Sequence, residues 1–210
     1  FNRPLMAISA AFSSILPITI AGAVLTLLEN VPFEPYINFI NQSGLVNMYK
    51  LGVDMTTNVL SVYLCFYIAY HYVKLYEEPG HPCGILAMIC FFMITGINDK
   101  LIEMNFLGAS GIFTAILVSI LVGKFYVLIM KRDLYIKAPT SIPKQVLQAL
   151  DAVVPYFVII AIFIMLISLV KMTSYGNFHE MIYASIHSTL MTYMSSNIFS
   201  YVMISLICNC

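Results

Sequence analysis

The hydrophobic positions of this chain fall into long runs separated by short polar segments. Residues 5–28 contain no charged side chain. About 24 residues rising 1.5 Å each are enough to cross the ~30 Å hydrocarbon core of a bilayer. Pro17 lies in the middle of this run, where a membrane helix tolerates proline. Comparable runs at 55–76, 107–130 and 146–170 predict three further transmembrane helices.

The remaining segments are shorter or more mixed. Residues 83–96 form about 14 apolar positions, which fits either a tilted, short span or a re-entrant piece. Residues 29–44 are polar and proline-rich and are interpreted as an interfacial loop. Residues 178–191 predict an amphipathic helix in the interface plane, and 194–208 begin a sixth span. The predicted fold class is therefore all-α, a polytopic transmembrane helix bundle with about five to six spans plus an amphipathic surface helix.

Composition excludes a soluble fold. The 210 residues are 60% hydrophobic and only 10% charged, whereas a soluble domain carries roughly 25% charged residues. A soluble chain of this kind would expose apolar patches far larger than a few hundred Å². The net charge is zero, so a nucleic-acid partner is not expected. The expected surroundings are the lipid bilayer.

Lysine and arginine placement predicts the orientation. If the first five spans alternate in direction, one side carries six basic residues and the other carries Lys50, Lys100 and Lys171. The positive-inside rule then puts the N-terminus and the loop 131–145 in the cytoplasm. This assignment requires residues 83–96 to cross the membrane. The six basic residues are Arg3, Lys74, Lys131, Arg132, Lys137 and Lys144.

No catalytic or metal chemistry is visible in the sequence. The cysteines do not follow zinc or disulfide spacing, and those within apolar runs are interpreted as small hydrophobic residues. Each of the four histidines is expected to pack or to lie at an interface. Asp151 is interpreted as a solvated acid at a span end, with an interhelical polar contact as the alternative. No phosphate-binding loop or nucleophile elbow occurs, so no catalytic residue, metal site or cofactor is predicted.

Several short motifs carry a resemblance to a known family. They are Leu107-Gly108-Ala109, Gly111-Ile112-Phe113, Ile136-Lys137-Ala138-Pro139, Ile142-Pro143 with Val146, Pro155, and Leu16-Pro17 followed by Gly22. In this order they resemble the membrane permease subunit (EIIC) of bacterial sugar phosphotransferase systems, lactose/cellobiose type. Ala138 replaces the methionine usual in that family. The arginine that usually precedes the first helix body is missing or displaced to Arg3.

The proline-containing loop can also be interpreted without the resemblance. Pro139 and Pro143 fix their own φ angles and disfavour helix at the residues before them. The loop is therefore expected to be stiff and extended, with Lys137 and Lys144 on either side. It is either a rigid connector or a docking or hinge surface for a cytoplasmic partner.

The resemblance implies a function. A permease of this kind moves a disaccharide such as cellobiose, chitobiose or lactose while a cytoplasmic subunit (EIIB) phosphorylates it. The chain would then be a transporter subunit of the bacterial plasma membrane and not an enzyme. In the family, sugar is held by a second half that contains a tryptophan motif. This chain contains no tryptophan, so its substrate-binding residues are unknown.

The resemblance also predicts an organisation in two parts. Residues 1–172 would form an N-terminal scaffold that makes a homodimer, and 173–210 an amphipathic helix and the start of the transport domain. Gly22, Gly108 and Gly111 are expected to allow close helix packing. The alternative function is a non-transporting scaffold or remnant that only oligomerises. An unrelated secondary transporter would require an inverted repeat, and none is apparent.

Overall fold

The computed structural model describes most of the first 172 residues and a short piece beyond them. The described residues are 2–98, 101–102, 104–132, 134, 143–172 and 181–182. The predicted amphipathic helix at 178–191 lies outside them except for 181–182, and the predicted sixth span at 194–208 lies outside them entirely.

The described part of the chain is helical, which confirms the predicted fold class. It also contains a small antiparallel hairpin with strands of two residues each, in which Ile97 pairs with Ile102. The α-helices and strands, in chain order, are α1 (Asn2–Glu29), α2 (Glu34–Gln42), α3 (Leu45–Thr56), α4 (Leu60–Lys74), α5 (Gly80–Thr95), β1 (Ile97–Asn98), β2 (Leu101–Ile102), α6 (Ile112–Lys131), α7 (Lys144–Asp151) and α8 (Val153–Lys171). Two short 3-10 helices, η1 (Met104–Phe106) and η2 (Ala109–Gly111), lie between β2 and α6.

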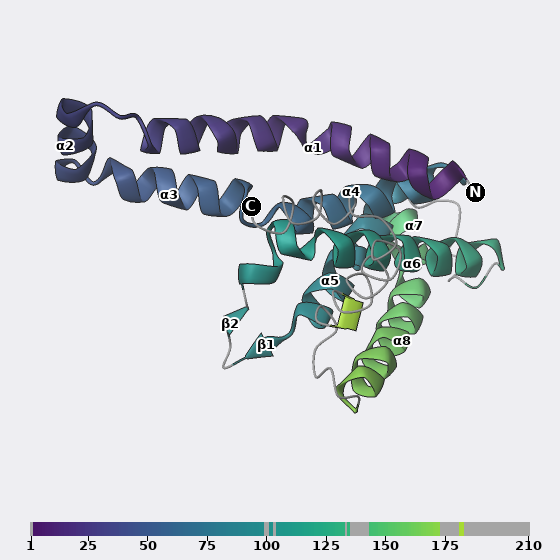
Figure 1. Ribbon diagram of the computed structural model, residues 1–210. Coiled ribbons are helices and arrows are strands. Elements are labelled where there is room, and N and C mark those ends of the chain that lie inside the picture. The colour runs from purple at the N-terminus through teal and green to yellow at the C-terminus, as the bar shows by residue number, and fades with distance from the viewer. Residues whose placement is uncertain are drawn as a thin grey trace, which may run out of the picture.

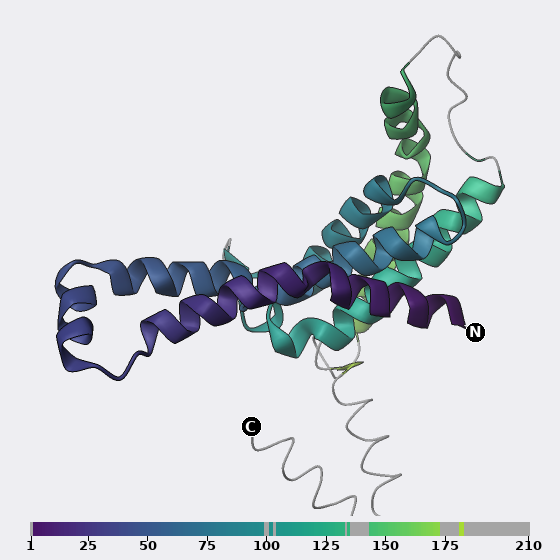
Figure 2. The same ribbon diagram turned by 90° about the horizontal axis from the view of Figure 1, so that it is seen from above.

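The first three helices form a long arm that projects from the rest of the molecule (Figure 1). The C-terminal half of α1 and α3 run side by side, and α2 closes their far end, as the view from above also shows (Figure 2). Glycine allows the chain to turn into α3, because Gly44 adopts a φ of 76° that other residues rarely take. At the base of the arm, the hydroxyl groups of Thr56 and Thr57 occupy the space that a Cβ atom at Gly22 would need.

The interpretation of residues 29–44 as a loop without secondary structure is wrong. Residues 34–42 form α2, which has Pro35 near its start and Glu34 in its first turn. Both residues suit a helix N-terminus, where the missing N–H of proline costs nothing and a negative charge is favourable. Ile40, only 2% exposed, anchors the helix. A single buried position of this kind is too weak a periodic signal to stand out in a polar segment.

The body of the molecule consists of α4, α5, α6 and α8, and the N-terminal half of α1 packs on α4. Two hydrogen bonds fix how the helix ends meet. Ser61 at the start of α4 donates its backbone N–H to Leu107, just before α6, at 2.8 Å. Tyr156 at the start of α8 donates its hydroxyl to the carbonyl of Pro82 at the start of α5, at 2.7 Å. Therefore α4 and α6 run in one direction, and α5 runs in the opposite direction and packs against both.

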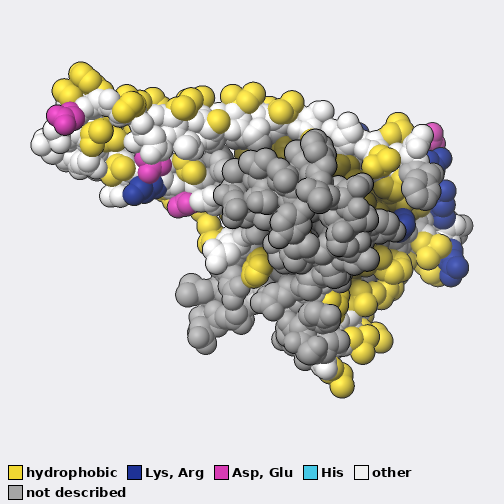
Figure 3. Space-filling model, viewed as in Figure 1, with side chains coloured by type: hydrophobic (Ala, Val, Ile, Leu, Met, Phe, Trp, Pro, Cys, Tyr) yellow, Lys and Arg dark blue, Asp and Glu magenta, His cyan; other side chains and the backbone are white. Residues whose placement is uncertain are grey.

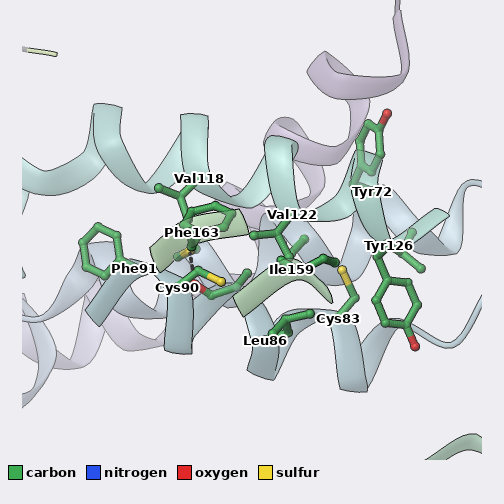
Figure 4. Close-up of a cluster of buried hydrophobic side chains, with 14 of the residues drawn as sticks. Tyr72, Cys83, Leu86, Cys90, Phe91, Val118, Val122, Tyr126, Ile159 and Phe163 are labelled. Atoms are coloured by element: carbon green, nitrogen blue, oxygen red, sulfur yellow. Dashed lines mark hydrogen bonds between the residues drawn. The ribbon is translucent and has the colours of Figure 1, made fainter. Parts of the chain in front are cut away.

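The core of this body is apolar (Figure 4). Phe91 on α5, Val118 and Val122 on α6 and Phe163 on α8 converge there and are almost completely covered. Cys65, Cys83 and Cys90 are free and buried in the same region, as expected for thiols that act as small hydrophobic groups.

Four helical segments are long and apolar enough to cross a membrane within the described residues. They are Asn2–Glu29, Leu45–Lys74, Ala109–Lys131 and Val146–Val170. The predicted runs 5–28 and 146–170 lie wholly within them, and the runs 55–76 and 107–130 each extend two residues beyond one end. The second segment begins ten residues earlier than expected, because α3 continues the line of α4. The helix α5, with 16 residues, extends about 24 Å at 1.5 Å per residue and is shorter than the hydrocarbon core.

Replacement of Gly111 tests how the start of α6 is held. A Cβ atom there would lie 1.8 Å from the backbone oxygen of Phe106, whereas a Cβ at Gly108 would lie 3.2 Å from the oxygen of Asn58. Gly111→Ala is therefore expected to destabilise the protein by about 1–3 kcal/mol, as overpacking does, and Gly108→Ala by clearly less. Thermal denaturation in detergent measures both variants. Equal melting temperatures for the two would contradict the described contact.

Candidate functional site

The predicted cytoplasmic loop motif is described only at its end. Lys137 and Pro139 lie outside the described residues, so their roles stay predictions. Pro143 is exposed and precedes α7, and its carbonyl accepts hydrogen bonds from the N–H groups of Val146 and Leu147 at 3.0 and 3.1 Å. Lys144 is the first residue of α7. A short stiff helix thus leads from the loop into α8.

The three predicted packing glycines lie at points of close approach within one chain. Gly22 faces α3, and Gly108 and Gly111 lie against the turn before α4 and the turn before α6. Sequence reasoning missed other glycines in the body, among them Gly84 and Gly123. A Cβ at Gly84 would lie 2.7 Å from the ring of Phe66, and one at Gly123 would lie 2.6 Å from the ring of Tyr72. The sequence around a glycine in an apolar run does not indicate which side chain of another helix packs against it.

A polar pair joins α1 to α4 between their apolar faces. The Ser14 hydroxyl lies 2.8 Å from Nε2 of His71. The imidazole stacks against Tyr67 and meets Tyr70 edge-on. His71 is thus held by packing and one interhelical hydrogen bond, in agreement with a packing histidine.

Basic and tyrosine side chains meet where α1 begins and α4 and α6 end. The Arg3 guanidinium carbon lies 4.3 Å from the centre of the Tyr76 ring, and the Lys131 ammonium lies 4.9 Å from it. We call Arg3, Tyr76 and Lys131 the tyrosine-centred cluster. Lys and Arg side chains gather at this end of the molecule, the end that carries the N-terminus (Figure 3). Next to the cluster, Lys74 lies 5.0 Å from the ring of Tyr70.

The turn after α4 shapes the electrostatics of this cluster. Glu77 adopts a φ of 66°, which is uncommon for a residue other than glycine. The interaction of the Tyr76 hydroxyl with Tyr72 is the largest cause that lowers the pKa of Tyr76, and the interaction with Arg3 is the second. Partial burial raises the pKa of Glu78, and the positive charge of Lys131 opposes that rise. Glu78 and Lys131 therefore interact electrostatically, without an ion pair within 4.0 Å.

Two buried polar atoms stand without a hydrogen-bond partner among the described residues. They are the hydroxyl oxygen of Tyr126 on α6 and one carboxylate oxygen, Oδ1, of Asp151 at the end of α7. The interpretation of Asp151 as a solvated acid at a span end is thus corrected for that oxygen. No group of three or more histidine, cysteine or acidic residues suited to a metal ion occurs in the described part of the chain.

Two shallow hollows lie along α1 beside the start of α4. Each has a volume of about 430 Å³ and is widely open, and both include Thr19 and Leu60. Their walls are almost wholly apolar apart from a few hydroxyl groups. They do not bring together the several convergent polar groups that orient a ligand. The two hollows along α1 therefore do not form an evident sugar pocket.

Long apolar helices with a polar end define a polytopic membrane protein. The family description "Phosphotransferase system, EIIC" matches residues 9–209. The chain therefore belongs to the phosphotransferase system EIIC family, and it is a multi-pass protein of the plasma membrane. This confirms the resemblance inferred from the sequence motifs.

Two curated relatives and one solved structure show how far the similarity extends. The chain is 27% identical over 202 residues to the oligo-beta-mannoside-specific EIIC component of Bacillus subtilis (strain 168), covering 90% of this chain and 45% of the relative. It is 25% identical over 203 residues to the galactose-specific EIIC component of Lactococcus lactis subsp. cremoris (strain MG1363), covering 85% and 44%.

The fold is similar to that of the transporter ChbC, the IIC component of the N,N'-diacetylchitobiose-specific phosphotransferase system. The TM-score is 0.84 at 20% identity, and the match covers 96% of this chain and 50% of that one. The chain spans about half the length of the curated relatives it matches.

Removal of the Ser14 hydroxyl tests the link between α1 and α4. Ser14→Ala leaves His71 without its interhelical partner and is expected to lower stability by about 0.6 kcal/mol, the average for hydrogen bonds between membrane helices. Ser13→Ala is the matched control, because that hydroxyl is exposed and bonds only Ser9 of its own helix. Thermal denaturation in detergent compares the two. A loss as large for Ser13→Ala as for Ser14→Ala would show that the interhelical bond adds nothing.

Proposed function

We propose that this chain is the scaffold part of a sugar permease that works with a phosphotransferase system. The observation that carries the proposal is the family match over residues 9–209 together with the ChbC-like fold. The permease would move a disaccharide such as cellobiose, chitobiose or lactose, and a cytoplasmic EIIB subunit would phosphorylate it. No described feature favours the alternative of a scaffold that only oligomerises.

Phosphorylation explains how such uptake is directional. A phosphate group adds about 1.5–2 negative charges near neutral pH, by analogy with phosphoserine. The product cannot recross hydrocarbon, because a charge at the bilayer centre is costly. The permease therefore has to supply binding and alternating access, and the donor subunit supplies the phosphoryl group. Nothing in this division of labour requires a catalytic residue in the described helices.

The two named relatives differ in their sugars, since one is specific for oligo-beta-mannosides and the other for galactose. This chain is similar to both at nearly the same identity. That similarity supports a role for these helices as a common framework, with sugar selection elsewhere in the complete permease. The sugar contacts therefore stay unassigned.

The transport proposal is tested in cells that lack other disaccharide permeases but contain the cytoplasmic phosphotransferase subunits. The complete gene that encodes these residues is expected to cause accumulation of the phosphate of cellobiose, chitobiose or lactose. The 210-residue chain alone, reconstituted in liposomes, is expected to show no saturable uptake. Saturable uptake by the chain alone would place the sugar site within it.

Membrane insertion and orientation serve as the control for that experiment. In a background with Cys208→Ser and Cys210→Ser, the Lys137→Cys variant reports the side of the loop 131–145. We propose that this loop and the N-terminus are cytoplasmic, since four of the six basic residues on that side lie within residues 131–144, between the spans that contain α6 and α8. Protection from an impermeant thiol reagent in intact cells agrees with this. If the variant is protected and no sugar phosphate forms, the transport proposal is rejected.

We also propose that the chain forms a homodimer through the arm. Among the described residues, α2 and α3 make their main contacts with helices of the arm itself, and α1 leaves Ile20 62% exposed there. In the same cysteine background, Ile20→Cys is expected to form a disulfide-linked dimer under mild oxidation. Phe157→Cys on α8, where the side chain is 75% exposed, is the matched control and should remain monomeric on the gel. Equal cross-linking at both positions, or none at Ile20, would count against a dimer through the arm.

A further inference from the structure

Two positive charges from separate helices share one aromatic ring. Arg3 comes from the start of α1, Lys131 is the last residue of α6, and Tyr76 follows α4. Their distances to the ring centre, 4.3 and 4.9 Å, limit the two charges to about 9 Å from one another. That separation is close to one Debye length at physiological salt, so the charges repel. The Tyr76 ring attracts each of them, but it carries no negative charge to neutralise them.

The cluster has no ion-pair partner among the described residues. The salt bridge found among the described residues joins Lys50 to Glu29 at 4.0 Å, and both of these residues belong to the arm. Of the two glutamates in the turn after Tyr76, Glu77 is exposed and Glu78 is partly buried. Neither forms an ion pair within 4.0 Å with Arg3 or Lys131, although the charges of Glu78 and Lys131 interact at longer range. The geometry thus gathers two cations around Tyr76 without a direct ion pair, which leaves room for an anionic ligand.

Phosphate is the anion whose chemistry suits this arrangement. A guanidinium group presents parallel N–H donors that match two phosphate oxygens, and an ammonium group adds a compact positive charge. Tyrosine favours the headgroup level of a bilayer, because its ring is apolar and its hydroxyl is polar. Basic pockets between membrane helices are a known setting for lipid headgroups.

The apolar surface next to the cluster indicates that the phosphate belongs to a lipid. Leu5 and Met6 follow Arg3 in the first turns of α1 and are 63% and 55% exposed. Leu128 lies one turn before Lys131 on α6 and is 47% exposed. Cations at the helix ends with bare hydrocarbon one turn deeper match a phosphate headgroup attached to acyl chains. A soluble phosphate or a phosphorylated protein would make no use of that hydrocarbon.

We propose that Arg3, Tyr76 and Lys131 form a binding site for the phosphodiester headgroup of an anionic membrane lipid, with its acyl chains against the exposed leucine and methionine side chains of α1 and α6. The site is separate from sugar transport and depends only on the multi-pass membrane placement. It holds together the ends of helices that otherwise meet only through side chains, so lipid binding also stabilises the body.

The experiment uses the purified 210-residue chain in an uncharged detergent. Phosphatidylglycerol and phosphatidylcholine with the same acyl chains are titrated separately, and binding is followed by native mass spectrometry and by the melting temperature. The wild-type chain is expected to bind phosphatidylglycerol more tightly. Each cation removed, by Arg3→Gln or Lys131→Gln, is expected to weaken phosphatidylglycerol binding about fivefold, the equivalent of roughly 1 kcal/mol per basic residue near an anionic lipid surface.

Two controls separate the site from general charge. The double variant Lys50→Gln/Lys124→Gln removes two positive charges outside the cluster, one more than either cluster variant, and should bind phosphatidylglycerol as the wild-type chain does. Tyr76→Phe keeps the ring and should bind nearly normally, whereas Tyr76→Leu should not. If a cluster variant fails to fold, the salt dependence of the wild-type chain still decides, because binding by two cations has to weaken as salt rises.

Three results would overturn the proposal. One is an equal preference for phosphatidylglycerol in the Arg3→Gln and wild-type chains. Another is stabilisation by inorganic phosphate alone that matches the stabilisation by phosphatidylglycerol, which would indicate a site for soluble phosphate. The third is wild-type lipid binding that is insensitive to salt. A loss confined to the cluster variants, with lipid needed for the effect, supports a lipid headgroup site.

Discussion

Every backbone N–H and C=O group that lies in hydrocarbon has to find its partner within the protein, because no water is present to replace it. This constraint determines most of the described structure. It makes the apolar runs helical, and it allows irregular backbone only at the helix ends, where the turn after α4, the small hairpin and the segment before α6 occur. Even Pro17 remains inside a continuous helix. The arrangement of the helices is a separate matter, because apolar side chains are equally soluble in lipid and in the protein core.

Close approach and a few polar contacts determine that arrangement. Where lipid competes with packing, helices associate through small residues and interhelical hydrogen bonds. Both are present at the start of α6. The backbone of Phe106 lies against Gly111, which has no side chain to prevent this, and the Ser61 hydroxyl donates a hydrogen bond to the carbonyl of Gly108. At the opposite end Tyr156 donates to Pro82. At each end of the body, one hydrogen bond from a hydroxyl to a backbone carbonyl thus links two helix ends, and the apolar core lies between these two bonds.

The sequence was sufficient to predict the four long apolar spans and the family, and insufficient to predict the contacts between the helices. Apolar length is a local property, so residues 5–28 and 146–170 could be assigned directly. The helix α3 was missed because Lys50 and Asp54 interrupt its apolar positions, although α1 covers part of it in the arm. The pair of Ser14 and His71 could not be predicted, since 57 positions separate them in the chain. The same holds for Arg3, Tyr76 and Lys131, which meet only after three helices have packed.

The two ends of the described helices differ chemically, and the difference follows from what each end has to do in a bilayer. The arm ends in a reversal at Gly44 and contains its own ion pair between Lys50 and Glu29. The other end carries cations that lie against tyrosine rings and have no described ion pair. Aromatic rings can hold a cation at the interface without neutralising it, so the charge remains available to the surroundings. A membrane protein with neutral net charge can therefore still present a locally positive face, because the separation of charges along the bilayer normal matters more than their sum.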